Sequence, residues 1–199
     1  MRVRRRPKKA ASNVYAFIDS QNLNLGVQKV GWKMDWRAFR AYLKDEFNVT
    51  KAFMFIGYMQ GNESLYEHMH ELGFLIALKP TVDVSANDRD KEDADYKPTV
   101  KGNIDADLVL YAMKELPKYD KAIIVSGDGD FVSLIEYLAE QNKLLKVLTP
   151  NWQYSSLLKP WENYVIRIDQ LRNQLAYRDH RNRRRSNNNQ ANPKNNPEK

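Results

Sequence analysis

Short apolar runs alternate with amphipathic stretches along most of this chain. Continuous apolar runs, which are typical of strands buried on both faces of a sheet, lie at residues 14–18, 52–58, 74–78, 122–125, 144–148 and 165–168. Apolar residues at helical spacing lie between or after them, at residues 35–47, 63–72, 104–116, 131–142 and 169–177. The alternation predicts an α/β fold, with a central, mostly parallel sheet and helices on both of its faces.

The segment 81–101 breaks this alternation, because it is rich in acidic residues and has no periodicity. Residues 88–92 resemble the start of an EF-hand calcium loop. Position 6 of that loop would be Asp93 instead of glycine, and position 12 would be Thr99 instead of glutamate, so the EF-hand fails. We expect a solvated loop, and its length leaves open a role as a flap over a site.

Charge divides the chain into three parts. Residues 1–9 hold six basic residues and no acid, and residues 178–199 hold seven basic residues against two acids. Because the whole chain carries a net charge of +7, the body between these ends is mildly acidic. We therefore expect a basic disordered arm at 1–12, a folded domain at 13–177 and a basic, Asn-rich disordered tail at 178–199.

The basic ends predict a polyanionic partner, since cationic arms bind nucleic acid by releasing its condensed counterions. Simple solubilising tails are the alternative. The candidate nucleic-acid contacts in the arms are Arg4, Arg5, Arg6, Arg183, Arg184 and Arg185.

Composition excludes several classes of site and location. The chain has no cysteine, so it has no disulfide, zinc–thiolate site or thiol nucleophile. No apolar run approaches the roughly 20 residues of a membrane span, and the apolar run at 14–18 is too short for a secretory signal. We expect a cytoplasmic protein without a membrane partner.

Two acids follow the strand predicted at 122–125. Asp128 and Asp130 alternate with Gly127 and Gly129, which permit a tight turn and a close approach of the backbone to a ligand. A helix begins immediately afterwards, so N-capping explains Asp130 adequately but does not explain Asp128. Asp128 is therefore the stronger candidate for a functional acid.

Other acids are predicted at the same edge of the sheet. Asp19 directly follows the first strand, with Asn22 one short turn further on, although a helix N-cap also accounts for Asp19. On the helix that starts at residue 104, Asp105 shares the apolar face with Leu108, while Asp107 lies on the opposite, solvated side. A carboxylate on an apolar face is costly unless it is paired or binds a metal, so Asp105 joins the candidates.

Three strand–helix junctions thus each bring an acid to one edge, where open α/β sheets bind ligands. Oxygen ligands suit Mg²⁺ or Mn²⁺, and the lack of cysteine disfavours zinc. Such a site can bridge a phosphodiester, activate water and stabilise an in-line displacement.

Three short motifs carry these residues: 17–23 (Phe-Ile-Asp-Ser-Gln-Asn-Leu), 101–105 (Lys-Gly-Asn-Ile-Asp) and 125–131 (Val-Ser-Gly-Asp-Gly-Asp-Phe). In this order they resemble the NYN domain of the PIN-like nuclease group, which includes the LabA-like proteins. The resemblance spans roughly residues 13–150. It implies a Rossmann-like, PIN-type fold with a ribonuclease site that depends on Mg²⁺ or Mn²⁺.

The resemblance also assigns roles by motif. It implies metal binding by Asp19, Asp105 and Asp128, a fourth catalytic acid at Asp130, and supporting polar groups at Asn22 and Ser126. Lys101 in the second motif is a further candidate contact to nucleic acid. Many family members have another acid one turn after Asp105, where this chain has Val109, Leu110 and Tyr111, and this departure weakens the case for a second metal.

Two functions follow as hypotheses. The first is a metal-dependent endoribonuclease acting on single-stranded or structured RNA, and the second is a non-catalytic nucleic-acid-binding module that keeps the fold. A phosphatase of the haloacid dehalogenase type would need a second Asp where Gln21 stands. Trp32, Trp152, Tyr154 and Trp161 are candidates for base stacking or for a homodimer interface, with ordinary packing as the default.

Overall fold

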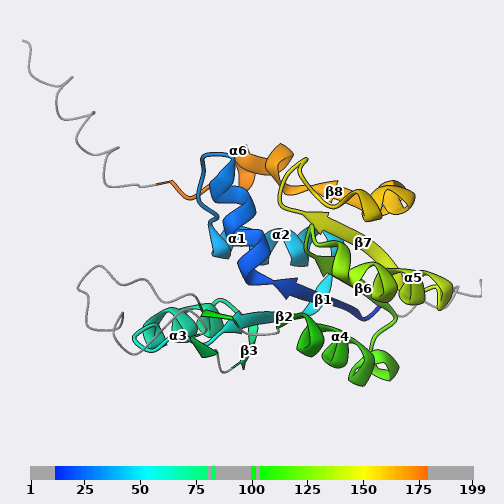
Figure 1. Cartoon of the computed structure of the whole chain (residues 1–199), viewed down its shortest axis with the longest axis horizontal. Helices are drawn as coiled ribbons and strands as arrows, with labels where there is room; N and C mark the ends of the chain where they lie inside the picture. Colours follow the sequence, from blue (N-terminus) through cyan, green and yellow to red (C-terminus); the bar gives the residue numbers. More distant parts are fainter. Residues whose placement is uncertain (1–11, 80–81, 84–99, 102–103, 179–199) are drawn as a thin grey trace, which may run out of the picture.

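The computed structural model describes residues 12–79, 82–83, 100–101 and 104–178. Its centre is a six-stranded sheet in the order β3-β2-β1-β6-β7-β8, and all of its strand pairs are parallel (Figure 1). The strands are β1 (Val14–Asp19), β2 (Val49–Gly57), β3 (Leu75–Lys79), β6 (Lys121–Val125), β7 (Leu144–Thr149) and β8 (Val165–Arg167). The predicted parallel sheet is confirmed.

Helices cover both faces of this sheet, as predicted. One face carries α1 (Ser20–Lys29), α2 (Trp36–Phe47), α3 (Glu63–Glu71) and α6 (Arg172–Leu175). The other carries α4 (Ile104–Lys114), α5 (Val132–Glu140) and the 3₁₀ helix η4 (Ser156–Tyr164). Shorter 3₁₀ turns are η2 (Leu116–Lys118), η3 (Gly129–Phe131) and η5 (Ile168–Leu171).

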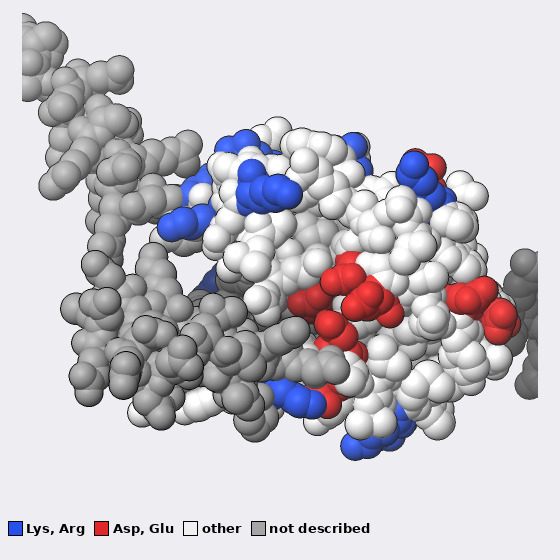
Figure 2. Space-filling view, viewed as in Figure 1, with Lys and Arg blue, Asp and Glu red and all other residues white. Residues whose placement is uncertain are grey.

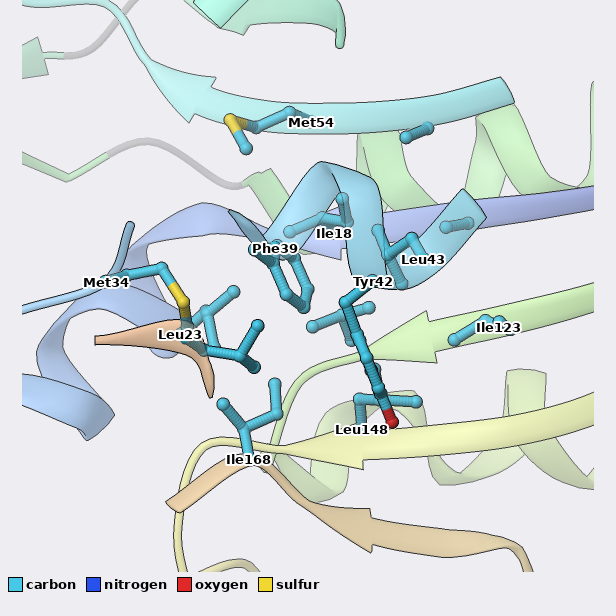
Figure 3. Packing of buried hydrophobic residues seen from close by; sticks show 14 of the residues in the cluster. Ile18, Leu23, Met34, Phe39, Tyr42, Leu43, Met54, Ile123, Leu148 and Ile168 are labelled. Carbon is cyan, nitrogen blue, oxygen red and sulfur yellow. The ribbon is translucent and has the colours of Figure 1, made fainter. Parts of the chain in front are cut away.

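The alternation of side chains along β1 builds two separate cores. Ala16 and Ile18 face the first layer of helices, where they pack with Leu23 and Phe39 (Figure 3). Phe17 faces the opposite layer, in the core that α4 and α5 share. Because β1 is central and buried on both faces, its sequence is a continuous apolar run that ends only at Asp19.

The strand order reverses direction between β1 and β6. From β1 the chain winds outward through β2 and β3, and from β6 it winds the other way through β7 and β8. The crevice beyond the carboxyl ends of β1 and β6 is therefore the topological switch point, where α/β folds bind ligands.

Several elements differ from expectation. The ends of the predicted 81–101 loop pair as a short antiparallel ladder of β4 (Val82–Asp83) and β5 (Val100–Lys101), too short to show a sequence periodicity. Residues 84–99, including the EF-hand-like stretch, lie outside the described residues. The helix predicted at 169–177 is only η5 followed by α6. Neither η4, which includes Pro160, nor the extent of α1 was predicted.

No described helix has both the length and the apolar character that crossing a membrane would require.

Candidate active site

Asp19 is the innermost acid of the candidate site. It ends β1, and only 6% of its surface is exposed. Its Oδ1 accepts the backbone N–H of Asn22 at 3.0 Å, and its Oδ2 accepts the Ser126 hydroxyl at 3.2 Å. The first bond makes Asp19 the N-cap of α1, so the capping role is confirmed.

The charge of this carboxylate is not compensated within the described part of the chain. Asp19 has no ion-pair partner there, and burial raises its pKa to about 6. The N–H of Asn22 opposes this shift, and the negative charges of Asp105 and Asp128 add to it. A buried, unpaired carboxylate is costly for folding, and such groups cluster at functional sites.

Asn22 and Ser126 connect the two junctions that flank the switch point. The side-chain oxygen of Asn22 accepts the backbone N–H of Gly127 at 2.9 Å. Ser126 is buried, and its hydroxyl oxygen accepts the N–H of Asp128 at 3.1 Å while the hydroxyl donates to Asp19. The network therefore sets the turn after β6 in a defined position relative to the end of β1.

The capping roles in that turn are reversed from the prediction. Asp128 Oδ1 accepts the N–H of Asp130 at 3.0 Å and caps η3, whereas α5 has no side-chain cap. The prediction that Asp130 caps the helix was wrong, because a 3₁₀ turn precedes α5 and helical structure starts earlier than the apolar pattern indicated. Asp130 is exposed.

The two glycines of the turn make room for the chain's own loop after β7. A Cβ on Gly129 would lie 2.5 Å from Ser155 Oγ and 2.9 Å from Leu157 Cδ1, and one on Gly127 would lie 3.2 Å from Tyr154 Cβ. Neither glycine has a positive φ. The close approach predicted toward a ligand is thus an approach to residues 154–157.

Asp105 enters the site from the first turn of α4. It is half-buried, and its pKa is raised by burial and by the neighbouring charges of Asp128 and Asp130. Asp107, in contrast, pairs with Lys79 at 2.8 Å. Asp107 is also half-buried, so the prediction that it lies on the solvated side of the helix was wrong, and the two acids differ in their neighbours instead of in their burial.

The acids gather on one face of the molecule. Figure 2 shows a group of red side chains in its middle, between α4 and the start of α5, bordered mostly by uncharged residues, with lysines and arginines nearer the rim. The charges of Asp105 and Asp128 act on the pKa of Asp19, and those of Asp128 and Asp130 act on the pKa of Asp105. Within the described residues, however, no three acids or histidines stand close enough to share a metal ion.

Most of the predicted nucleic-acid contacts belong to parts of the chain that the structure does not describe. Arg4, Arg5, Arg6, Arg183, Arg184 and Arg185 are outside the described residues. Lys101 belongs to β5, and its role stays a prediction.

Sequence reasoning missed the loop that follows β7. Asn151 is buried and donates from Nδ2 to the carbonyl of Gly26 at 2.7 Å, while its Oδ1 accepts the N–H of Gln153 at 2.7 Å. The loop also packs on the turn after β6, where the N–H of Ser155 donates to the carbonyl of Gly127 at 2.9 Å. A polar Asn after a strand is typical of any turn, so the sequence held no specific signal for this role.

The sequence profile of the NYN domain matches residues 13–169, most of the chain. This chain belongs to the NYN domain family. The low amplitude and bright protein LabA of Synechococcus elongatus is 25% identical over 159 residues, covering 77% of this chain and 83% of LabA. The predicted NYN, LabA-like character is confirmed, and the family is generally one of nucleases.

The fold has a counterpart among solved structures. A crystal structure of a protein of unknown function from Vibrio parahaemolyticus superposes with a TM-score of 0.62 at 23% sequence identity. The match covers 84% of this chain and 99% of the other. At this identity the likeness supports the α/β fold and nothing further.

Proposed function

We propose that this NYN domain is an endoribonuclease that uses Mg²⁺ or Mn²⁺ held by Asp19, Asp105 and Asp128. The observation that carries the proposal is the buried carboxylate of Asp19 at the switch point, without a cationic partner among the described residues. The buried charge of Asp19 lies near two further acids, and a divalent cation would stabilise this arrangement.

The chemistry of the donor set fits such an ion. All three candidates offer carboxylate oxygens, which Mg²⁺ and Mn²⁺ prefer. Burial raises the pKa of Asp19 and of Asp105, and the charges of neighbouring acids add to both shifts, so a divalent cation would relieve the repulsion between these carboxylates. When bound, the cation would supply charge neutralisation at the phosphodiester and lower the pKa of water.

The other residues prepare the site for this role. Ser126 and Asn22 hold Asp19 and the turn after β6 in place, which reduces the reorganisation needed on binding. With a pKa of about 6, Asp19 is mostly ionised at neutral pH and thus ready to bind a cation. Asp130 lies at the exposed margin and is proposed as an accessory acid.

RNA is the proposed substrate, either single-stranded or structured. Lys101 and the basic ends of the chain would hold its phosphates near an otherwise acidic body. We further propose a cytoplasmic location, and the homodimer stays a prediction.

The proposal is tested by cleavage of end-labelled RNA with Mn²⁺, with EDTA, and with two matched variants. Asp128→Asn should lower cleavage about 10- to 100-fold, whereas Asp107→Asn should keep the activity, because Asp107 pairs with Lys79 outside the acid group. Equal cleavage by wild type and Asp128→Asn, or cleavage that persists in EDTA, would contradict the proposal.

A binding module without catalysis is the second candidate. The observation that favours it is the absence, among the described residues, of three acids already close enough to share an ion. It predicts RNA binding that weakens steeply with salt, with no cleavage under any metal condition. The same assay therefore distinguishes the two functions.

A further inference from the structure

A second surface leads away from the acids along the carboxyl edge of the sheet. A hollow of about 240 Å³ starts at Asn22 and Gly127, beside the acid group, and a hollow of about 430 Å³ ends at Trp152 and Arg172. Both are lined by Lys29 and Gln153, so they adjoin. We call the two together the lateral groove.

Trp152 forms an exposed platform at the far end of the lateral groove. Its side chain is 55% exposed, and the Arg167 guanidinium lies 5.8 Å from the ring centroid. Arg167 is itself held by Asp169, through hydrogen bonds of 3.1 Å and 2.6 Å. The exposed ring of Trp152 does not pack into a core. It instead contacts the guanidinium of Arg167, which Asp169 holds in place.

The backbone on either side of Trp152 is also held in place. Asn151 is buried and bonds to Gly26 and to the N–H of Gln153, at 2.7 Å each. Gly26 allows this contact, since a Cβ there would lie 2.4 Å from Pro150 Cβ. A flat ligand that bound to this platform would therefore cause little further loss of backbone entropy.

The charge of the lateral groove is opposite to that of the acid group. Lys29 is exposed and has no ion-pair partner within the described chain, and Arg172 is held by a 3.1 Å bond to the carbonyl of Gly31. The carboxylate of Asp169 is already engaged by Arg167. The hollow on the other flank of the acids, about 400 Å³, is mostly apolar and has no Lys or Arg among its described lining residues.

We infer that the lateral groove binds a single RNA strand, with one base stacked on Trp152 and the phosphates beside Lys29 and Arg172. Stacking on an aromatic ring requires a base face that a duplex does not expose. The side chains of Lys29 and Arg172 neutralise the phosphates. Because the groove continues to Asn22 and Gly127, it leads the strand to the acids. The inference deepens the proposed ribonuclease function and rests on it for the identity of the ligand.

Binding of a short fluorescein-labelled single-stranded RNA, and of its duplex, to full-length protein tests the inference. All variants carry Asp128→Asn and binding is measured in EDTA, so that cleavage does not interfere. Trp152→Ala should weaken single-strand binding roughly tenfold, and Trp152→Phe, which keeps a ring, should weaken it less. Duplex binding should be unchanged.

The phosphate contact is tested with a matched pair of lysines. Lys29 and Lys44 both lie in the last turn of a helix, but only Lys29 lines the lateral groove. Lys29→Ala should reduce the slope of log affinity against log salt by about 1, and Lys44→Ala should leave it unchanged. Equal effects of the two would show that only the overall charge matters and would overturn this contact.

The outcomes separate this inference from the proposed function. Unchanged single-strand binding by Trp152→Ala, equal losses for single strand and duplex, or no binding at all would overturn the inference, even if Asp128→Asn abolishes cleavage. Weaker binding by Trp152→Ala, together with cleavage that does not depend on Asp128, would refute the ribonuclease and leave the groove as a binding surface.

Discussion

Asp19 and Asp130 lie at the same edge of the sheet in very different surroundings. Asp19 is buried at the end of a central strand and accepts hydrogen bonds from Asn22 and Ser126. Asp130 is exposed, and its turn is braced mainly by the loop after β7. Burial at the inner position fixes the carboxylate of Asp19 and raises its pKa. At the outer position, the carboxylate of Asp130 stays in contact with solvent.

The acids of the site differ in how firmly the fold holds them. Strands β2 and β6 flank β1 on both sides, so Asp19 stays where the sheet places it. Asp105 and Asp128 stand at the starts of helical turns, where small changes can bring carboxylates together. We therefore expect the effects of substitution to decrease from the inner to the outer acid.

The largest effect is expected for Asp19→Asn. The asparagine can still cap α1 through its oxygen and donate to Ser126, so the fold should unfold no more easily than wild type at pH 7. Cleavage should fall by about 100-fold or more, equivalent to about 2.7 kcal/mol of activation free energy. Kinetic assays measure the loss of cleavage, and thermal unfolding measures the stability. Cleavage by Asp19→Asn at the wild-type rate would contradict the greater importance of the inner acid.

The buried carboxylate should also make stability depend on pH. The folded-state pKa of Asp19 is about 6, against an ordinary value of 3.8, so the folded state binds more protons between these values. The free energy of unfolding should therefore fall as pH rises from about 4 to above 6, by about 3 kcal/mol from this group.

Urea unfolding in EDTA, at several pH values, measures this loss. Asp19→Asn lacks the titrating group and serves as the reference, so the wild-type curve should approach or fall below it as pH rises. Parallel curves for the two proteins would mean that Asp19 is not desolvated in solution.

Asp128 should combine a moderate functional effect with a measurable structural one. Because Asn is a good N-cap and Ala is not, only Asp128→Ala should lower the free energy of unfolding, by about 1 kcal/mol. Both variants should lower cleavage about 10- to 100-fold. Chemical denaturation and kinetics separate the two roles. Equal stability of the two variants would show that the Asp128 side chain does not stabilise η3 as an N-cap.

The smallest effect is expected at the outer edge. Asp130→Asn should change cleavage by about threefold or less, because an exposed charge is screened by solvent and salt. Its effect should still exceed that of Asp107→Asn, since Asp130 acts on the pKa of Asp105 and Asp107 does not. A loss as large as that of Asp19→Asn would place Asp130 among the inner acids.

Much of this site could be predicted from the sequence because strand ends and helical phase are local properties. The apolar run at β1 ends at Asp19, and the run at β6 ends three residues before Asp128. The phase of α4 was less informative, because Asp105 and Asp107 are both half-buried and only the ion pair of Asp107 with Lys79 distinguishes them. The capping roles of Asp128 and Asp130 were not predictable in this way, because a single 3₁₀ turn shifts the cap without changing the apolar pattern.

The sequence by itself determined the alternation of strands and helices, the acids at three junctions and the membership in the NYN family, because periodicity and motifs are written in consecutive residues. Only the tertiary structure decided which groups meet. The link from Asp19 to Ser126 spans 107 residues, and the bond from Asn151 to Gly26 spans 125. Contacts of that range depend on the order and packing of the strands, as do the raised pKa of Asp19 and the position of Trp152 at the far end of the lateral groove.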